Sequence, residues 1–322
     1  MKYEKQFLVG IGSIILSFVF YCSSAIALTN KEQLAAMKQG KRMAAIEIEN
    51  VIKPTIFNFF TEKELAVAKN IDVNVVLDER ISRVQAIDYT GKKKIEISTG
   101  FISLIAALAE AEHLAIKFKK EAYMEKYFWE IEKYLNSYQD NALKGVKKKW
   151  PDSFYLYAGI SKDAYQKELN TQEYNNAFSL LMRTSLSYIL THEYAHHIFG
   201  HMGKKKPKDL AESRRNEDEA DDFSIRVNWA IGNSPLSIMN YFILFSMIEN
   251  NLYQGTHAPS ACRLEKFLHA GIKFEEGSLK YYEPTTRKML EKGLNKVKEK
   301  HPPLRKACEE GSALTNSTIP IL

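Results

Sequence analysis

The chain has 322 residues, of which 45% are hydrophobic and 26% are charged. This balance is ordinary for a globular protein and excludes a largely disordered chain. The formal net charge of +6 is small for this length, so it does not indicate a nucleic-acid-binding protein. We therefore expect no nucleic-acid partner, while the oligomeric state stays unknown.

The first 27 residues have the layout of a secretory signal peptide. A basic start that contains Lys2 and Lys5 precedes a long apolar run, and small residues follow it up to Ala27. This pattern predicts an exported, periplasmic or cell-envelope protein with cleavage after about Ala27. A retained N-terminal membrane anchor also fits, because the apolar run from residue 7 to residue 28 is long enough to span a bilayer.

Lysines gather in local clusters, for example at residues 92–94 and 147–149. Such clusters fit solvated loops and helix faces, or alternatively peripheral contact with the anionic headgroups of a membrane. Once the signal is removed, the remaining cysteines are Cys262 and Cys308. A pair of this kind can form a disulfide in an oxidising compartment, and the sequence leaves that pairing open.

The predicted elements begin with a helix and a small sheet. The apolar spacing predicts a helix over residues 30–50, and alternation then predicts strands near residues 71–77, 83–89 and 95–97. The later part of the chain is predicted to be helical, with a basic connection at residues 144–159. The expected helices cover residues 100–118, 121–139, 171–199, 209–231, 236–250 and 285–299. The fold class is therefore α+β, mostly helical, with a small antiparallel sheet that precedes the helix at residues 171–199.

The segment His192-Glu193-Tyr194-Ala195-His196 fits the pattern H-E-x-x-H. Helical residues four apart differ by about 40° around the axis, so both imidazoles can reach one small cation. Glu193 lies about 100° from His192, where it can approach a bound water. The pattern predicts a zinc site with Glu193 as general base. The alternative is a pair of core histidines satisfied by hydrogen bonds.

The third ligand is expected from the next helix, where residues 217–222 contain five carboxylates. Relative to the inward-facing Ala220, Glu217 lies at about 60° and Asp221 at about 100° on the same side. Glu219 lies about 100° to the other side. Glu217 is therefore the predicted metal ligand, and Asp221 the predicted acceptor of the free N–H of a ligating histidine. The alternative is a solvated acidic face.

Other polar residues compete for a part in the site. His257 and Arg263 lie in one segment, and either could donate a hydrogen bond to a developing oxyanion. The alternative is a loop anchored by packing. A similar stretch begins at His301, so the choice between His257 and His301 stays open. His197 and His201 are predicted to be packed or surface residues.

The combined pattern resembles a known group of metallopeptidases. The motif His192-Glu193-x-x-His196 followed by Glu217-x-x-Ala220-Asp221 resembles the gluzincin endopeptidases of the HtpX and CAAX-prenyl-protease type. It is at least as similar to their relatives, the Lit phage-exclusion peptidases. In those families the glutamate of E-x-x-A-D is the third zinc ligand, which corresponds to Glu217.

This resemblance covers about residues 70–118 and 175–270. It implies a single zincin-like metallopeptidase domain over residues 28–322, with a helical insertion at about residues 119–170. We therefore expect a zinc-dependent endopeptidase that acts on a protein or peptide substrate, with the strand near residues 95–98 pairing with the substrate. The alternative is a non-catalytic, zinc-containing binding or chaperone-like envelope protein. The sequence indicates neither the substrate nor the cleavage specificity.

Overall fold

A computed structural model describes most of the chain between residues 30 and 242. The described residues are 30–78, 84–89, 91–124, 126–131, 133–134, 152–202, 210–239, 242, 263, 266–271 and 273. The predicted signal peptide at residues 1–27, the helix at 285–299 and most of the helix at 236–250 lie outside these residues. So do Cys262 and Cys308, and also parts of the helix and the connection predicted between residues 121 and 159.

The chain divides into two compact units, each of which is described by itself. Unit 1 comprises Met1–Lys53, Val73–Gln85 and Glu96–Arg183, and unit 2 comprises Pro54–Asp72, Ala86–Ile95 and Thr184–Leu322. The long helix α9 (Gln172–Ile198) contributes residues to both units. The predicted single domain over residues 28–322 stays a prediction.

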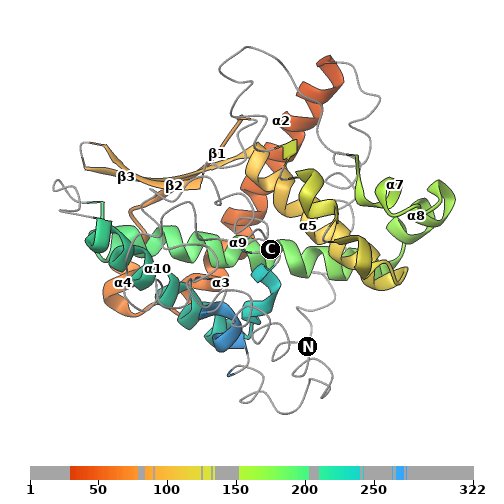
Figure 1. The fold of residues 1–322 in the computed structure, drawn as a ribbon. Helices are drawn as coiled ribbons and strands as arrows, with labels where there is room; N and C mark the ends of the chain where they lie inside the picture. Colours follow the sequence, from red (N-terminus) through yellow and green to blue (C-terminus); the bar gives the residue numbers. More distant parts are fainter. Residues whose placement is uncertain are drawn as a thin grey trace, which may run out of the picture. The chain divides into compact units, whose positions relative to one another are not determined.

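The helices are drawn in Figure 1 and follow the predicted order. Those of unit 1, besides the first part of α9, are α2 (Asn30–Glu47), η1 (Ile48–Ile52), α5 (Thr99–Lys117), η2 (Glu121–Tyr123), α7 (Phe154–Tyr157) and α8 (Lys162–Leu169). Those of unit 2, besides the rest of α9, are α4 (Glu62–Ala68), α10 (Leu210–Ile231) and η3 (Pro235–Ile238), with α3 (Lys53–Phe57) beginning at its border. The predicted helices at residues 30–50, 100–118, 171–199 and 209–231 are confirmed.

Four short helices, α3, α4, α7 and α8, were not individually predicted, and α7 lies in the segment predicted as a connection. Two of the four, α4 and α8, carry a local signal. At α4, the Thr61 side chain accepts a bond from the Glu64 backbone N–H, and the Glu64 carboxylate accepts one from the Thr61 backbone N–H. At α8, the Ser161 hydroxyl accepts from the Ala164 backbone N–H. Both arrangements satisfy amide groups that a helix start leaves unpaired. Their short apolar faces give too little periodicity to be recognised.

The three strands form one small sheet with the order β1-β3-β2. They are β1 (Asp72–Val76), β2 (Val84–Tyr89) and β3 (Lys92–Ser98). Strands β2 and β3 form a hairpin through a turn in which Gly91 has a φ of +83° (Figure 1). The α+β class is confirmed, but the sheet is mixed and not antiparallel as predicted. Alternation along one strand reveals its two faces. It does not show which strands pair or whether paired strands run in the same direction.

Helix α5 forms much of the core of unit 1. Its start is capped by the Ser98 hydroxyl, which accepts from the Phe101 backbone N–H at 3.1 Å. The helix is long and apolar enough to cross a membrane, yet 83% of its apolar stretch is buried inside the fold. This burial is typical of a core helix, because a helix that is apolar all round needs cover on every side.

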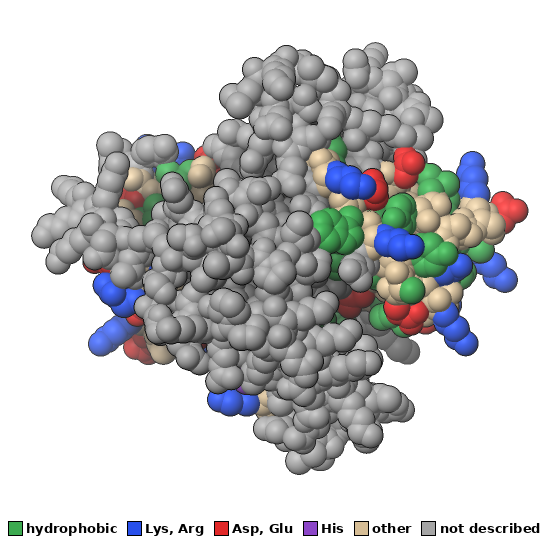
Figure 2. Space-filling view, in the orientation of Figure 1, with side chains coloured by type: hydrophobic (Ala, Val, Ile, Leu, Met, Phe, Trp, Pro, Cys, Tyr) green, Lys and Arg blue, Asp and Glu red, His purple; other side chains and the backbone are tan. Residues whose placement is uncertain are grey.

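On the face shown in Figure 2, basic and acidic side chains are interspersed among apolar ones over α5, α7 and α8. Mixed charge of this kind is typical of a solvated surface. The predicted absence of a nucleic-acid partner and the predicted peripheral membrane contact stay predictions.

A buried acid lies inside unit 1. Glu110 of α5 is 2% exposed, and its Oε2 accepts hydrogen bonds from the hydroxyls of Tyr165 at 3.0 Å and Tyr174 at 3.4 Å. Burial raises the pKa of Glu110 from 4.5 to about 7, and the two hydrogen bonds, which lower it, offset burial only in part. Burial therefore favours the neutral form of Glu110 over the carboxylate.

The buried Glu110 predicts a pH dependence of stability. Because its folded pKa exceeds the unfolded one, its contribution is fully present below pH 4.5 and is lost as the pH rises through 7. Between pH 5 and pH 8 this group should lower the free energy of unfolding by about 2 to 3 kcal/mol. Urea unfolding measures this effect. The free energy of unfolding of Glu110→Gln should change less than that of wild type between pH 5 and pH 8, by the same amount. The exposed Glu121→Gln is the control, and an unchanged dependence in Glu110→Gln would contradict the assignment.

Candidate metal centre

A buried polar network sets the register between α9 and α10 in unit 2. The Thr191 hydroxyl lies 2.9 Å from the Ser224 hydroxyl and accepts from the Asn228 amide at 3.0 Å. The Ser224 hydroxyl lies 2.6 Å from the Tyr188 carbonyl oxygen. Thr191, Ser224 and Asn228 are at most 1% exposed. Sliding one helix past the other would break these bonds between the helices in the interior, which is costly. The network therefore fixes which turn of α10 faces His192.

The inward face predicted for α10 is confirmed. Ala220 and Val227 are fully buried, while Asp218 and Asp222 are exposed. Glu217, one turn before Ala220, is 8% exposed. The helical periodicity therefore separates the buried carboxylate of Glu217 from its exposed acidic neighbours.

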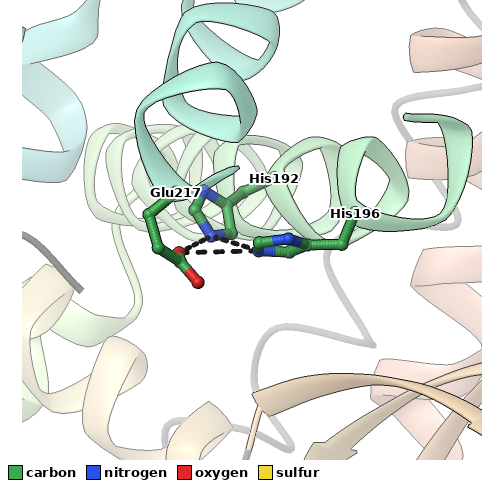
Figure 3. Close-up of side chains that lie close together, drawn as sticks. All are labelled: His192, His196 and Glu217. Carbon is green, nitrogen blue, oxygen red and sulfur yellow. Dashed lines mark hydrogen bonds and ion pairs between the residues drawn. The ribbon is translucent and has the colours of Figure 1, made fainter. Parts of the chain in front are cut away.

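The side chains of His192, His196 and Glu217 point toward one another from α9 and α10 (Figure 3). Nε2 of His192 lies 3.0 Å from Oε2 of Glu217 and 3.1 Å from Nε2 of His196. Nε2 of His196 lies 3.5 Å from the same Glu217 oxygen. Each of the three residues is 8% exposed. One ligand atom from each residue lies within 4.8 Å of the other two, an arrangement that could hold a metal ion.

The chemistry of this donor set fits a cation. Nδ1 of His192 lies 2.9 Å from Oδ1 of Asp221, so the neutral ring is assigned its proton there and keeps a lone pair on Nε2. That lone pair, the Nε2 of His196 and the Glu217 carboxylate then converge as buried acceptors. Burial lowers the pKa of His192, but the hydrogen bonds with Asp221 and Glu217 more than offset this and raise it to about 9. The site therefore attracts positive charge, which a proton or a metal ion can supply.

Asp221 orients His192, and Arg263 in turn holds Asp221. The Arg263 guanidinium donates two hydrogen bonds of 2.8 Å to the Asp221 carboxylate and lies over the Phe242 ring. Burial alone would raise the pKa of Asp221, but Arg263 and His192 hold it well below its usual value. Asp221 thus contacts the ring nitrogen of His192 that does not contact Glu217. The sequence suggested Arg263 as an oxyanion donor, but its guanidinium is hydrogen-bonded to the Asp221 carboxylate.

A neighbouring stripe of α9 contacts the β2–β3 hairpin. The Glu193 carboxylate accepts from the Ala86 backbone N–H of β2 at 2.6 Å. The His197 ring nitrogen Nε2 lies 2.8 Å from the Lys94 carbonyl of β3. Because residues 193 and 197 are four apart, they share one face of the helix. The buried Glu193 is thus fixed beside the metal-ligand stripe, and His197 is a packed residue as predicted.

His201 is a packed residue, which fits its prediction, but it also contacts a candidate metal ligand. Its Nδ1 lies 3.1 Å from Nδ1 of His196, and its Nε2 lies 2.9 Å from Oε2 of Glu219. The sequence pattern did not place this residue at the site, because it follows the end of the helix at Gly200. His257 and His301 lie outside the described residues, so their predicted roles stay predictions.

Comparison with known proteins identifies a family. The model of the peptidase U49 family matches residues 101–283, more than half of the chain. This family is Lit-like, and the matched segment includes His192, His196 and Glu217. No curated protein and no solved structure matches the chain.

The predicted likeness to the Lit peptidases is therefore confirmed at the level of the family, whereas the likeness to the HtpX and CAAX-prenyl-protease type stays a prediction. The match makes this chain a peptidase, and its substrate a protein or peptide. The protein belongs to the peptidase U49 family.

Proposed function

We propose that the protein is a zinc-dependent endopeptidase in which His192, His196 and Glu217 hold the metal and Glu193 is the general base. The observation that carries this proposal is the convergence of three buried ligand atoms from two helices within 4.8 Å. Two imidazoles and one carboxylate suit zinc and leave a coordination position open, as in catalytic zinc sites. When bound, zinc supplies a Lewis acid and lowers the pKa of a water.

Glu193 moves the proton in this proposal. Its Oε2 is held by the Ala86 backbone N–H, and we assign proton transfer to the other oxygen, Oε1. As the water oxygen adds to the peptide carbonyl carbon, Glu193 takes the water proton. It then delivers that proton to the leaving nitrogen as the C–N bond breaks. The fixed backbone contact orients the carboxylate before the substrate arrives.

Strand β2 is the surface that best suits an extended substrate. The sequence suggested residues 95–98 for this part, but they belong to β3, which already pairs with a strand on each side. Strand β2 lies at an edge of the sheet, and its Ala86 contacts the Glu193 carboxylate. An edge strand offers backbone groups to an added peptide strand. A peptide along β2 would therefore lie next to the proposed base.

Family membership supports a peptidase over the non-catalytic alternative of a binding or chaperone-like envelope protein. Export by residues 1–27 to the periplasm or cell envelope remains part of the proposal, as does an oxyanion donor at His257. Both concern residues that lie outside the described part of the chain.

Replacing Glu193 by Gln should separate metal binding from hydrolysis. Glu193→Gln keeps the shape of the side chain but removes the base, so zinc content should stay near one ion per chain while cleavage of unfolded casein falls ~100-fold or more. Metal analysis and a peptide-release assay measure the two quantities. Turnover at the wild-type rate would remove Glu193 from its proposed role.

Replacing Glu217 by Ala should remove a ligand. Zinc retained after dialysis should fall strongly in Glu217→Ala, and chelator-sensitive hydrolysis should fall with it, because two histidines alone bind zinc poorly. Asp222→Ala is the matched control, since Asp222 lies on the exposed side of the same helix, 2.9 Å from Lys266. If the two variants retain equal zinc, the third ligand has been assigned to the wrong residue.

Replacing Arg263 should weaken zinc binding although Arg263 is not a ligand. Arg263→Ala releases the Asp221 carboxylate that orients His192, and zinc affinity should fall ~10-fold or more. Arg263→Lys keeps the charge but not the bidentate geometry, so its zinc affinity should lie between that of wild type and that of Arg263→Ala. Competition with a chromophoric chelator measures the affinity, with Lys266→Ala as control. Wild-type affinity in Arg263→Ala would show that Asp221 is held without Arg263.

A further inference from the structure

We infer that His201 is a positioning residue for the metal ligand His196, and that Glu219 sets the proton arrangement of His201. This inference rests on the proposed metal site and adds a residue that does not belong to the ligand motif. It depends on a chain of two short contacts between polar atoms, from His196 through His201 to Glu219.

The end of α9 brings His201 back to the site. The Phe199 backbone N–H still bonds the Ala195 carbonyl at 2.9 Å, and Gly200 then adopts a φ of +77°. Such a left-handed glycine ends a helix and turns the chain back toward its last turn. The His201 ring consequently packs edge-on against the His196 ring, with centroids 5.2 Å apart and an interplanar angle of 69°.

The contacts admit one consistent assignment of protons. The Glu219 carboxylate accepts the Nε2–H of His201 at 2.9 Å, which leaves Nδ1 of a neutral His201 as an acceptor. That Nδ1 accepts the Nδ1–H of His196 at 3.1 Å. The Nε2 of His196 then carries a lone pair on the side that faces His192 and Glu217. An outer partner of this kind fixes both the tautomer and the orientation of a ligating imidazole.

The middle residue of this chain of contacts, His201, is buried, and the outer residue, Glu219, is exposed. The His201 side chain is only 7% exposed, whereas that of Glu219 is 55% exposed. The neutral imidazole is thus shielded next to the ligand, while the charge of the carboxylate stays in water, where it is least costly. Residues 217 and 221 of α10 therefore supply a candidate ligand and the carboxylate that orients His192. Residue 219 supplies the carboxylate that orients His201.

The test measures zinc affinity of the full chain by chelator competition. His201→Phe keeps a ring but removes the acceptor, and zinc should bind ~10- to 100-fold more weakly. In His201→Asn, the side-chain oxygen can take the place of Nδ1, so affinity should recover to within ~3-fold of wild type. His197→Ala is the matched control, because the adjacent His197 contacts the Lys94 carbonyl instead of a ligand.

Glu219 provides an independent arm of the test. Glu219→Ala should weaken zinc binding less than His201→Phe does. The double variant should bind within ~2-fold of His201→Phe alone, because removing His201 already disconnects Glu219. Cobalt substitution adds a spectroscopic readout. The visible bands of the Co²⁺ protein should change in His201→Phe and return in His201→Asn, which a general loss of stability would not produce.

The outcomes separate this inference from the proposed function. Wild-type affinity in His201→Phe, with binding still lost in Glu217→Ala, would overturn the positioning role and leave the metal site in place. A wild-type chain that binds no zinc would overturn both. If His201→Phe fails to fold, Glu219→Ala decides, and wild-type affinity together with an unchanged cobalt spectrum in that variant would overturn the inference.

Discussion

The candidate site depends on the buried polar network between α9 and α10. Thr191, Ser224 and Asn228 lie in the interior and satisfy one another across the two helices. Apolar packing alone tolerates some sliding of one helix along another, whereas buried hydrogen bonds are lost when the register changes. This constraint brings Glu217 within 3.0 Å of His192. The same register places Asp221, one turn later, against the other nitrogen of the His192 ring.

Within that frame, α9 uses two neighbouring stripes for two purposes. Residues 192 and 196 face the ligand from α10, while residues 193 and 197 bond the β2–β3 hairpin. The spacing of four residues allows each pair to share a face. One helix therefore fixes the candidate metal ligands and the proposed base relative to an edge strand. Substrate, base and metal can then be brought together by elements that are each held by buried bonds.

The convergence of His192, His196 and Glu217 could be predicted from the sequence because helical geometry is regular. The positions of His192, His196, Glu217 and Asp221 follow from angles of about 100° per residue on two long helices. The α+β class and the main helices follow from apolar periodicity for the same reason. These predictions needed only the spacing of residues along each helix, whereas the register between α9 and α10 depends on the buried network.

The remaining features depend on tertiary contacts that periodicity does not describe. The mixed sheet arises from the pairing of β1 with β3, which alternation along a strand does not specify. Arg263 reaches Asp221 from a segment more than forty residues away. His201 reaches His196 only because Gly200 turns the chain back at the end of α9. A glycine followed by a histidine just after the second ligand is the one local signal that could have indicated this contact.

X-ray absorption spectroscopy of the purified, zinc-loaded chain identifies the ligand atoms themselves. We expect one zinc ion per chain with two imidazole nitrogens and carboxylate or water oxygens at about 2.0 to 2.2 Å. Glu217→Ala should lose this spectrum, and Asp222→Ala should keep it. A zinc ion with one imidazole, a zinc ion with sulfur ligands, or no bound metal would contradict the convergence of His192, His196 and Glu217 on one ion.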